Sequence, residues 1–247
     1  MKKIGILGGI GWPSTMEYYR LICEASQLYH NNKEFSGPIP MPEISIESLN
    51  MNFSVNNRGS SQPGSWYKWD SYLNAAIKRL EHSGAELIVI ASVTPHGRLN
   101  EILEGINAPV VSVYESIGAH CNEKGIKNLL VFGTMPTMNS PAFICGMEEF
   151  GVKAFYPPTV ELKESLLKVI ERLYQGKTDG TSLAINEIAR SCISSDLLDN
   201  TVICLGCTEL PLAFEGFNDM PSFESSGIKY LNSTVVHALA AFKECAK

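Results

Sequence analysis

The sequence lacks the features that would assign it to several large functional classes. No run of Lys and Arg stands out in its 247 residues, and the formal net charge is −6, so nucleic acid is not expected as the main partner. No stretch approaches the ~18 apolar residues of a membrane span. The apolar run at the N-terminus is too short for the core of a signal peptide. We therefore expect neither nucleic acid nor membrane as a partner.

Motifs for metals, nucleotides and hydrolysis are missing as well. Cys204-Leu-Gly-Cys207 has no second Cys pair or His pair that would complete a zinc site. The turn Gly8-Gly-Ile-Gly11 does not have the G-x-G-x-x-G spacing, and there is no Walker motif, so its glycines predict a tight turn and close approach to a small ligand. No G-x-S-x-G elbow or Ser-His-Asp order points to a hydrolase. The seven scattered cysteines indicate reduced thiols in the cytoplasm.

What remains is an ordinary globular composition, with 45% hydrophobic and 19% charged residues. The length suits one large domain or two small ones. Short β-branched runs alternate with longer helical patterns, and this order predicts an α/β protein with parallel sheets. We expect strands at residues 4–7, 43–47, 86–91, 109–113, 128–132 and 202–206, and helices at 14–26, 72–83, 97–104, 116–124, 162–174, 181–191 and 229–245.

The pattern of the first half restarts in the second. Ile4-Gly-Ile-Leu7 and Leu129-Leu-Val-Phe132 are each followed by a turn of small residues and then by a helix. Likewise, the strand before Ser92 resembles the strand before Cys207. The repeat predicts two pseudo-symmetric α/β halves. Because ligands bind beyond the carboxyl ends of parallel strands, we expect the four turns around one cleft.

One of these turns offers a single thiol, Cys207. It follows Gly206 and precedes Thr208 and Glu209, so it leaves an apolar strand into a polar turn. One interpretation is a small buried hydrophobic residue. The other is a catalytic thiol, whose thiolate a following helix N-terminus would favour. Cys204, inside the strand, is expected in the core.

Two further turns carry candidate polar groups. Ser92 and His96 follow the strand at 86–91. Ser92 is either a structural turn residue or a nucleophile, and His96 is either a structural residue or a base. Thr134 and Thr137 either cap a helix or bind a carboxylate. Residues 52–69, which are rich in Asn, Ser, Gly and aromatic side chains, form a long connection of the kind that often serves as a lid.

Five segments spread over nearly the whole chain carry a resemblance to a known family. They are Gly8-Gly-Ile-Gly-Trp-Pro-Ser-Thr-Met-Glu-Tyr-Tyr-Arg20, Ala91-Ser-Val-Thr-Pro-His96, Gly133-Thr-Met-Pro-Thr-Met138, Gly206-Cys-Thr-Glu209 and Phe223-Glu-Ser-Ser-Gly-Ile228. The first and fourth are the most specific. Together they resemble the aspartate/glutamate racemase superfamily.

This resemblance implies two pseudo-symmetric α/β domains, residues 1–113 with 222–247 and residues 114–221, commonly assembled as a homodimer. It also implies that an acidic amino acid is racemised without cofactor or metal. One thiol removes the α-proton and a second, on the opposite face, returns one; these positions are Cys207 and Ser92. The α-carboxylate would be held by Val93, Thr94 and Pro95, the distal carboxylate by Arg58 and Lys163, and the pocket would be lined by Thr134, Thr137 and Thr208.

Three residues depart from the family pattern. Ser92 replaces the first cysteine, Val93 replaces an asparagine that usually contacts the substrate, and Lys229 stands where a histidine is common. A serine hydroxyl is a far weaker acid than a thiol, so Ser92 acts as a base only with help from a neighbour, and His96 is the nearest candidate.

Three hypotheses follow. The first is a racemase of aspartate or glutamate that is slow or has skewed kinetic constants. The second is an enzyme of the same superfamily that needs only Cys207, such as a decarboxylase or isomerase. The third is a binding protein that kept the pocket and lost turnover.

Overall fold

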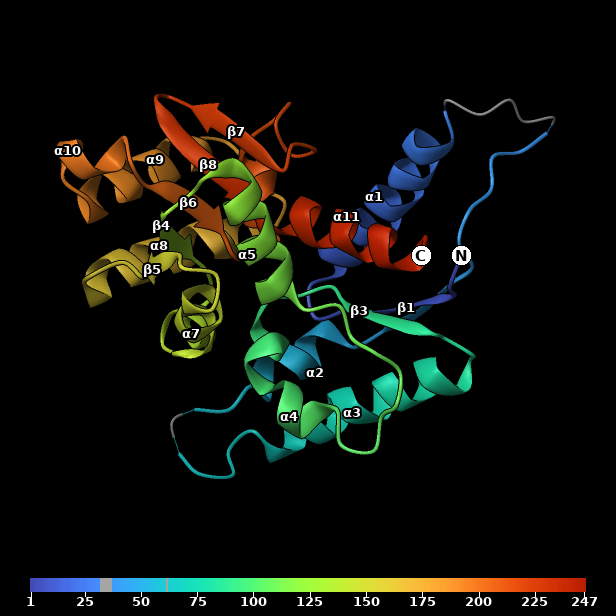
Figure 1. The fold of residues 1–247 in the computed structure, drawn as a ribbon. Coiled ribbons are helices and arrows are strands. Elements are labelled where there is room, and N and C mark those ends of the chain that lie inside the picture. Colours follow the sequence, from blue (N-terminus) through green and yellow to red (C-terminus); the bar gives the residue numbers. More distant parts are fainter. Residues whose placement is uncertain (32–36, 61) are drawn as a thin grey trace. The chain divides into compact units, whose positions relative to one another are not determined.

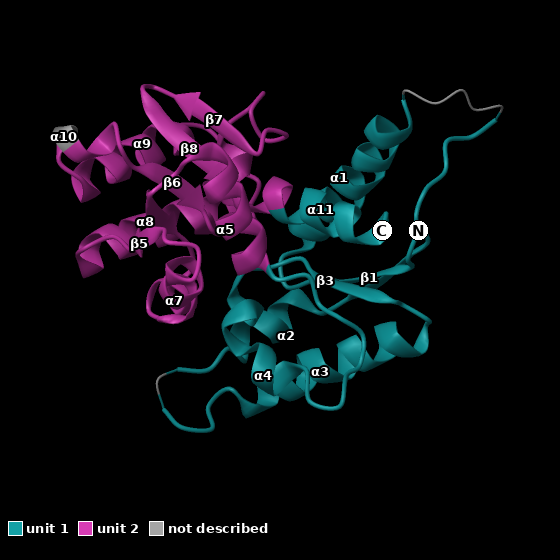
Figure 2. Cartoon of the chain, viewed as in Figure 1, with its two compact units in different colours: residues 1–112, 237–247 teal, residues 113–236 magenta. Residues whose placement is uncertain are grey.

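The chain forms two compact units, shown separately coloured in Figure 2. The computed structural model describes residues 1–31, 37–60 and 62–247, without the side chains of residues 195 and 196. Unit 1 comprises residues 1–112 and 237–247, and unit 2 comprises residues 113–236. No helix within the described residues combines the length and apolarity that a membrane span requires.

Unit 1 is built on a parallel sheet with strand order β2-β1-β3. Figure 1 shows α1 and α11 on one side of this sheet and α3 on the other. With both faces covered, β1 and β3 are buried along their whole length, as expected for parallel strands. The elements are β1 (Ile4–Gly8), α1 (Trp12–His30), β2 (Ile44–Ser48), α2 (Met51–Asn56), α3 (Tyr67–His82), β3 (Leu87–Ile90), the 3₁₀ helix η1 (Thr94–Arg98), α4 (Leu99–Ile102) and most of α11 (Ser233–Cys245).

The glycine turn after β1 packs against its own chain rather than standing open for a ligand. Gly9 has φ +72°, and a Cβ there would lie 2.2 Å from the backbone of Leu49. A Cβ on Gly8 would lie 2.3 Å from Thr15, whose hydroxyl accepts a hydrogen bond from the Gly9 N–H at 2.8 Å. The close approach that these glycines permit is therefore to α1 and to the end of β2.

Unit 2 is built on a five-stranded sheet with order β5-β4-β6-β8-β7, in which only β7 is antiparallel. Alternate residues of β4 and β6, such as Leu130 and Ile203, pack with α8 and α9 in one hydrophobic core. Cys204 is fully buried in β6, as predicted. The elements are α5 (Val113–Lys124), β4 (Asn128–Phe132), α6 (Met135–Met138), α7 (Ala142–Glu148), β5 (Lys153–Phe155), α8 (Val160–Tyr174), α9 (Thr181–Cys192), α10 (Ser195–Leu198), β6 (Val202–Leu205), the 3₁₀ helix η2 (Leu210–Ala213), β7 (Ser222–Ser225) and β8 (Ile228–Asn232).

The two sheets share one topology at their parallel strands. The orders β2-β1-β3 and β5-β4-β6 place the first strand of each half between the second and the third. This confirms the predicted α/β fold class with two similar halves. The difference is the β7–β8 hairpin, which has no counterpart among the described residues of unit 1.

Several boundaries differ from the expectation. The helix expected from residue 229 is preceded by the β7–β8 hairpin and begins only at Ser233; the hairpin pairs with β6, so the chain returns to unit 1 at His237 rather than at residue 222. The strand expected at 109–113 is reduced to one bridge between Val110 and Ile88. Helix α1 begins at Trp12, since Pro13 fits a first turn, and Ser14 lies inside it.

A buried imidazole ties α11 into unit 1. His237 Nε2 lies 2.9 Å from the Val111 carbonyl oxygen, which only accepts, so Nε2 carries the proton and Nδ1 accepts from the Tyr18 hydroxyl at 2.8 Å. The ring of His96 lies edge-on to His237 at 5.2 Å between centroids. Burial lowers the pKa of His237 to about 4, and burial with the neighbouring His237 lowers that of His96 well below its usual value. Both rings are therefore neutral at pH 7.

Neutral buried histidines predict loss of stability in acid. The unfolded chain protonates these rings near pH 6.5, whereas the folded chain resists protonation until about pH 4 for His237, so stability falls as pH drops through this window. His237 alone accounts for a loss on the order of 3 kcal/mol. We expect His237→Gln to be less stable than the wild type at pH 7 and to lose less stability between pH 7 and pH 5, as measured by urea unfolding.

The exposed His82 provides the matched control. His82→Gln should keep the stability of the wild type and the same fall between pH 7 and pH 5. An unchanged pH dependence in His237→Gln would contradict the assignment of a neutral ring to the folded state.

Candidate functional site

In unit 2, two predicted turns lie at the same edge of the sheet. Strands β4 and β6 are parallel neighbours, and the Gly206 N–H donates to the Phe132 carbonyl at 2.7 Å. A Cβ on Gly206 would lie 2.9 Å from that oxygen, so only glycine allows this approach. The turn of Thr134 and Thr137 is thereby brought next to the turn of Cys207.

Cys207 sits beside a buried carboxylate. The thiol is 4% exposed, and its Sγ–H donates to Glu209 Oε2 at 3.1 Å. The Thr208 hydroxyl donates to the same oxygen at 3.2 Å. Glu209 is itself buried at the start of η2. A carboxylate that receives the thiol proton can take it up and return it, which is the property required of an acid/base pair.

The remaining predicted residues of unit 2 lie close to β4. The hydroxyls of Thr134 and Thr137 are 3.3 Å apart, and both side chains are buried. Lys163, in the first turn of α8, reaches back to the end of α6, where its Nζ donates to the Met138 carbonyl at 3.1 Å and to Asn139 Oδ1 at 3.0 Å. The ammonium group thus lies near the same strand end, held by α6.

In unit 1, Ser92 and Val93 lie in the turn between β3 and η1, and Thr94 and Pro95 are the first two residues of η1. The Ala91 N–H donates to the Leu7 carbonyl at 2.9 Å, which keeps this turn beside the end of β1. Ser92 is half-buried, and within the residues that the structure describes no hydrogen bond to its hydroxyl was found. Val93 is buried, and its side chain is apolar at the position where the resemblance implies an asparagine.

His96 is directed into the core of unit 1. Its ring packs against His237, and the Ile90 carbonyl accepts a hydrogen bond from it. These contacts make His96 a structural residue of the His237 cluster and give no evidence for the predicted role as a base for Ser92.

Arg58 lies just beyond α2, in the segment expected to be a lid. Its Nε is buried and has no hydrogen-bond partner among the described residues. A buried guanidinium N–H without an acceptor is uncommon and calls for a missing partner. An anionic oxygen would supply one.

The segment that carries Arg58 is fixed by an aromatic and ionic clamp. Trp66 Nε1 donates to the Ser60 carbonyl at 3.0 Å, and a Cβ on Gly59 would lie 2.4 Å from the indole. The Arg98 guanidinium lies over the same indole, 5.0 Å from its centroid. Arg98 also makes two 2.6 Å hydrogen bonds to the Asp70 carboxylate, which raise the pKa of the guanidinium. The clamp therefore joins the Arg58 segment to η1, which follows Ser92.

Sequence reasoning did not assign a role to three residues near these turns: Glu209, Asn139 and Thr234. Glu209 could have been recognised from the Gly206-Cys-Thr-Glu209 motif, because it places a carboxylate two residues after Cys207. No local pattern marked the other two. Within the described residues, no cluster of three or more His, Cys, Asp or Glu side chains is arranged to hold a metal ion.

Two α/β units whose strand ends carry small polar side chains, Ser92 in one and Cys207 in the other, define a two-unit α/β protein. The chain matches the Asp/Glu/hydantoin racemase family model over residues 7–241. This span covers nearly the whole chain, so the protein belongs to the Asp/Glu/hydantoin racemase family and is an isomerase that acts on amino acids.

Solved structures support the same fold. A proposed Asp/Glu racemase from Yersinia pestis is 23% identical, with TM-score 0.78 and full coverage of both chains. An aspartate racemase homologue from Pyrococcus horikoshii is 28% identical, with TM-score 0.74 and full coverage of both chains. Glutamate racemase from Francisella tularensis, in complex with D-glutamate, is 17% identical, with TM-score 0.62, and the match covers 99% of this chain and 80% of that one.

The clamp predicts unequal costs for two Arg→Lys substitutions. Arg98 is 22% exposed and binds Asp70 with both arms of its guanidinium, so Arg98→Lys should cost about 1–3 kcal/mol in the free energy of unfolding. It should also speed limited proteolysis within residues 57–66, because the contact with Trp66 is lost.

Arg79 is the matched control, since it pairs with Glu47 but is 52% exposed. Arg79→Lys should change the stability by no more than about 0.5 kcal/mol. Equal effects of the two substitutions would show that the contacts of Arg98 with Asp70 and Trp66 do not stabilise the fold.

Proposed function

We propose that this protein racemises an acidic amino acid, aspartate or glutamate, by proton transfer at the α-carbon without a cofactor. Cys207 acts on one face of the substrate and Ser92 on the other. The observation that carries the proposal is the hydrogen bond from the Cys207 thiol to the buried Glu209 carboxylate. Membership of the Asp/Glu/hydantoin racemase family supports the reaction class.

On the Cys207 face, the thiolate removes the α-proton of the L-enantiomer and becomes a thiol. Glu209 takes the thiol proton before this step, so that Cys207 can act as the thiolate. When the product leaves, Glu209 releases that proton to water and the alkoxide left on Ser92 takes one from water, which restores both residues for the next turnover. Electrons left on the α-carbon are delocalised into the α-carboxylate. We assign that carboxylate to Val93, Thr94 and Pro95, whose turn has N–H groups at the start of η1.

On the Ser92 face, the hydroxyl donates a proton to the carbanion in the L-to-D direction and must remove one in the reverse direction. Removal requires a base, and no hydrogen bond to the Ser92 hydroxyl was found among the described residues. The enantiomers have equal free energies in an achiral solvent, so kcat/KM is the same in both directions. Ser92 therefore slows both directions, and only kcat and KM taken separately differ.

The charges of the candidate residues favour an acidic side chain on the substrate. Arg58 has a buried Nε without an acceptor, and Lys163 lies beside the turn of Thr134 and Thr137. We assign the distal carboxylate to Arg58 and Lys163, and the lining of the pocket to Thr134, Thr137 and Thr208. The glutamate racemase of Francisella tularensis, a structural neighbour, was solved with D-glutamate.

A one-thiol reaction is the second candidate, and the Ser92 environment favours it. An enzyme that only protonates or exchanges a proton at one face needs Cys207 and Glu209 but not Ser92. A binding role without turnover remains as the third outcome of the test below.

For assembly and location we infer a homodimer in the cytoplasm that works without pyridoxal phosphate. Family resemblance is the main support. No disulfide joins the seven cysteines, all of which lie in described parts of the chain.

Proton exchange in deuterated water separates these functions. Each enantiomer of aspartate and glutamate is supplied alone, and deuterium at the α-carbon and inversion are followed by NMR and chiral chromatography. We expect deuterium to enter the L-enantiomer faster than the D-enantiomer appears, because Cys207 has a carboxylate partner and Ser92 has none in the part of the chain that the structure describes. Deuterium exchange and inversion should both stop in Cys207→Ala.

A substitution of Ser92, the residue of the weaker face, completes the test. Ser92→Cys should raise the rate of inversion toward the rate of exchange. Exchange with no inversion in either protein would establish the one-thiol alternative, and tight binding without exchange would establish a binding protein.

Glu209 gives an independent prediction. Glu209→Gln keeps the shape and one acceptor but cannot take up the thiol proton, so exchange into the L-enantiomer should slow by about 10²-fold with little change in KM. Glu215→Gln, at an exposed carboxylate in the same unit, should leave the exchange rate unchanged. A wild-type exchange rate in Glu209→Gln would remove Glu209 from the mechanism.

A further inference from the structure

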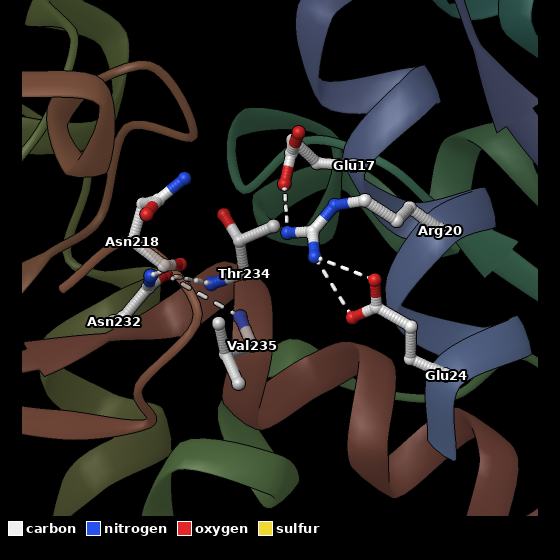
Figure 3. Close-up of polar contacts among 7 residues, drawn as sticks. All are labelled: Glu17, Arg20, Glu24, Asn218, Asn232, Thr234 and Val235. Atoms are coloured by element: carbon white, nitrogen blue, oxygen red, sulfur yellow. Dashed lines mark hydrogen bonds and ion pairs between the residues drawn. The ribbon is translucent and has the colours of Figure 1, made fainter. Parts of the chain in front are cut away.

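The first turn of α11 is held by side chains that all have partners, with one exception. Asn232, the last residue of β8, accepts hydrogen bonds on Oδ1 from the backbone N–H groups of Thr234 at 3.1 Å and Val235 at 3.3 Å (Figure 3). Its Nδ2 donates to the Asn218 carbonyl at 2.9 Å. The Ser233 hydroxyl donates to the Leu205 carbonyl at 2.6 Å. These bonds fix the start of the helix against β6.

The exception is the hydroxyl of Thr234. The residue is 3% exposed, and its Oγ1 is buried with no hydrogen-bond partner within the described residues. A threonine inside a helix usually donates to a carbonyl three or four residues earlier. At this position those carbonyls belong to Tyr230 and Leu231 in β8, outside the helix. A buried hydroxyl left in this state costs free energy and needs an explanation.

The position of Thr234 in the sheet supplies one. Strands β6 and β8 are parallel, with Leu205 paired to Asn232. Cys207 lies two residues beyond Leu205, and Thr234 lies two residues beyond Asn232. Both side chains therefore follow the carboxyl ends of neighbouring strands at the same edge of one sheet, where ligands of parallel α/β folds bind.

The charge at this position selects the ligand. Helix α11 has 13 residues, and its N-terminus carries the positive end of the helix dipole. An unpartnered hydroxyl and a helix N-terminus both favour an anionic oxygen.

We propose that Thr234 Oγ1 donates a hydrogen bond to a carboxylate oxygen of the amino-acid substrate, as a specificity-determining residue beside Cys207. This inference rests on the proposed function, because that function makes the ligand a dicarboxylate. Without the acid the hydroxyl has no partner among the residues that the structure describes, and it finds its acceptor when the acid binds.

The test uses the contrast between an unpaired and a paired buried threonine. Thr234→Val replaces a hydroxyl that has no partner by a methyl group of similar size, so the melting temperature should stay the same or rise. Affinity for L-aspartate and for succinate, which cannot be racemised, should fall about tenfold by calorimetric titration. Thr234→Ser should keep most of the affinity.

Thr201 provides the matched control, since it is equally buried at 3% and its hydroxyl donates to the Leu197 carbonyl at 2.8 Å. Thr201→Val should lower the melting temperature by about 2–4 °C and leave the affinity for both acids unchanged.

Three results would overturn the proposal. They are a Thr234→Val variant that melts lower and binds succinate normally, one that changes neither property, and a wild-type protein that binds neither acid. Succinate binding needs no turnover, so a wild type that binds succinate without inverting aspartate or glutamate would refute the racemase function while still deciding the role of Thr234.

Discussion

One hydrogen bond in unit 1 joins both ends of the segment that forms unit 2. The chain leaves unit 1 after Ser112 and returns at His237, and His237 Nε2 donates to the carbonyl of Val111, one residue before the departure. The bond requires a neutral ring with its proton on Nε2, and the Tyr18 hydroxyl on Nδ1 selects that tautomer. Burial keeps the ring neutral. One imidazole therefore connects the segment where the chain leaves unit 1 with the helix in which it returns.

The same cluster supports the turn that carries Ser92. His96 lies in η1, three residues after Val93, and its ring packs on His237. Arg98, at the other end of η1, is bound to Asp70 and Trp66. A 3₁₀ helix of five residues has little stability of its own, so its position follows from these two anchors. The rigidity of the Ser92 turn therefore comes from residues that have no part in the chemistry.

The sequence was sufficient where local chemistry decides the structure. The apolar run that ends at Gly206 predicted a strand directly before Cys207, and β6 lies there. Alternation of apolar runs predicted the parallel sheets. The prediction from this pattern was wrong at the β7–β8 hairpin. Residues Ile228 to Asn232 also fit a helix, and only their pairing with β6 makes them a strand. Side-chain pairing over long distances was equally invisible, as for His96 and His237.

Candidate binding residues were predictable only when a motif named them. Cys207 follows from its place in Gly206-Cys-Thr-Glu209, whereas Thr234 is one of many threonines until the bonding of its neighbours is known. Its hydroxyl stands out only because the side chains of Asn232 and Ser233 beside it are hydrogen-bonded to backbone groups. A property defined by the absence of a partner depends on the whole surrounding structure, so no sequence pattern encodes it.

Two of the buried polar atoms without a hydrogen-bond partner among the described residues, Arg58 Nε and Thr234 Oγ1, bear on the balance between stability and binding. A buried donor without an acceptor lowers the stability of the free protein, and an acceptor from a ligand removes that penalty on binding. The binding free energy then includes the relief of a strain already present, without a loss of hydrogen bonds to water.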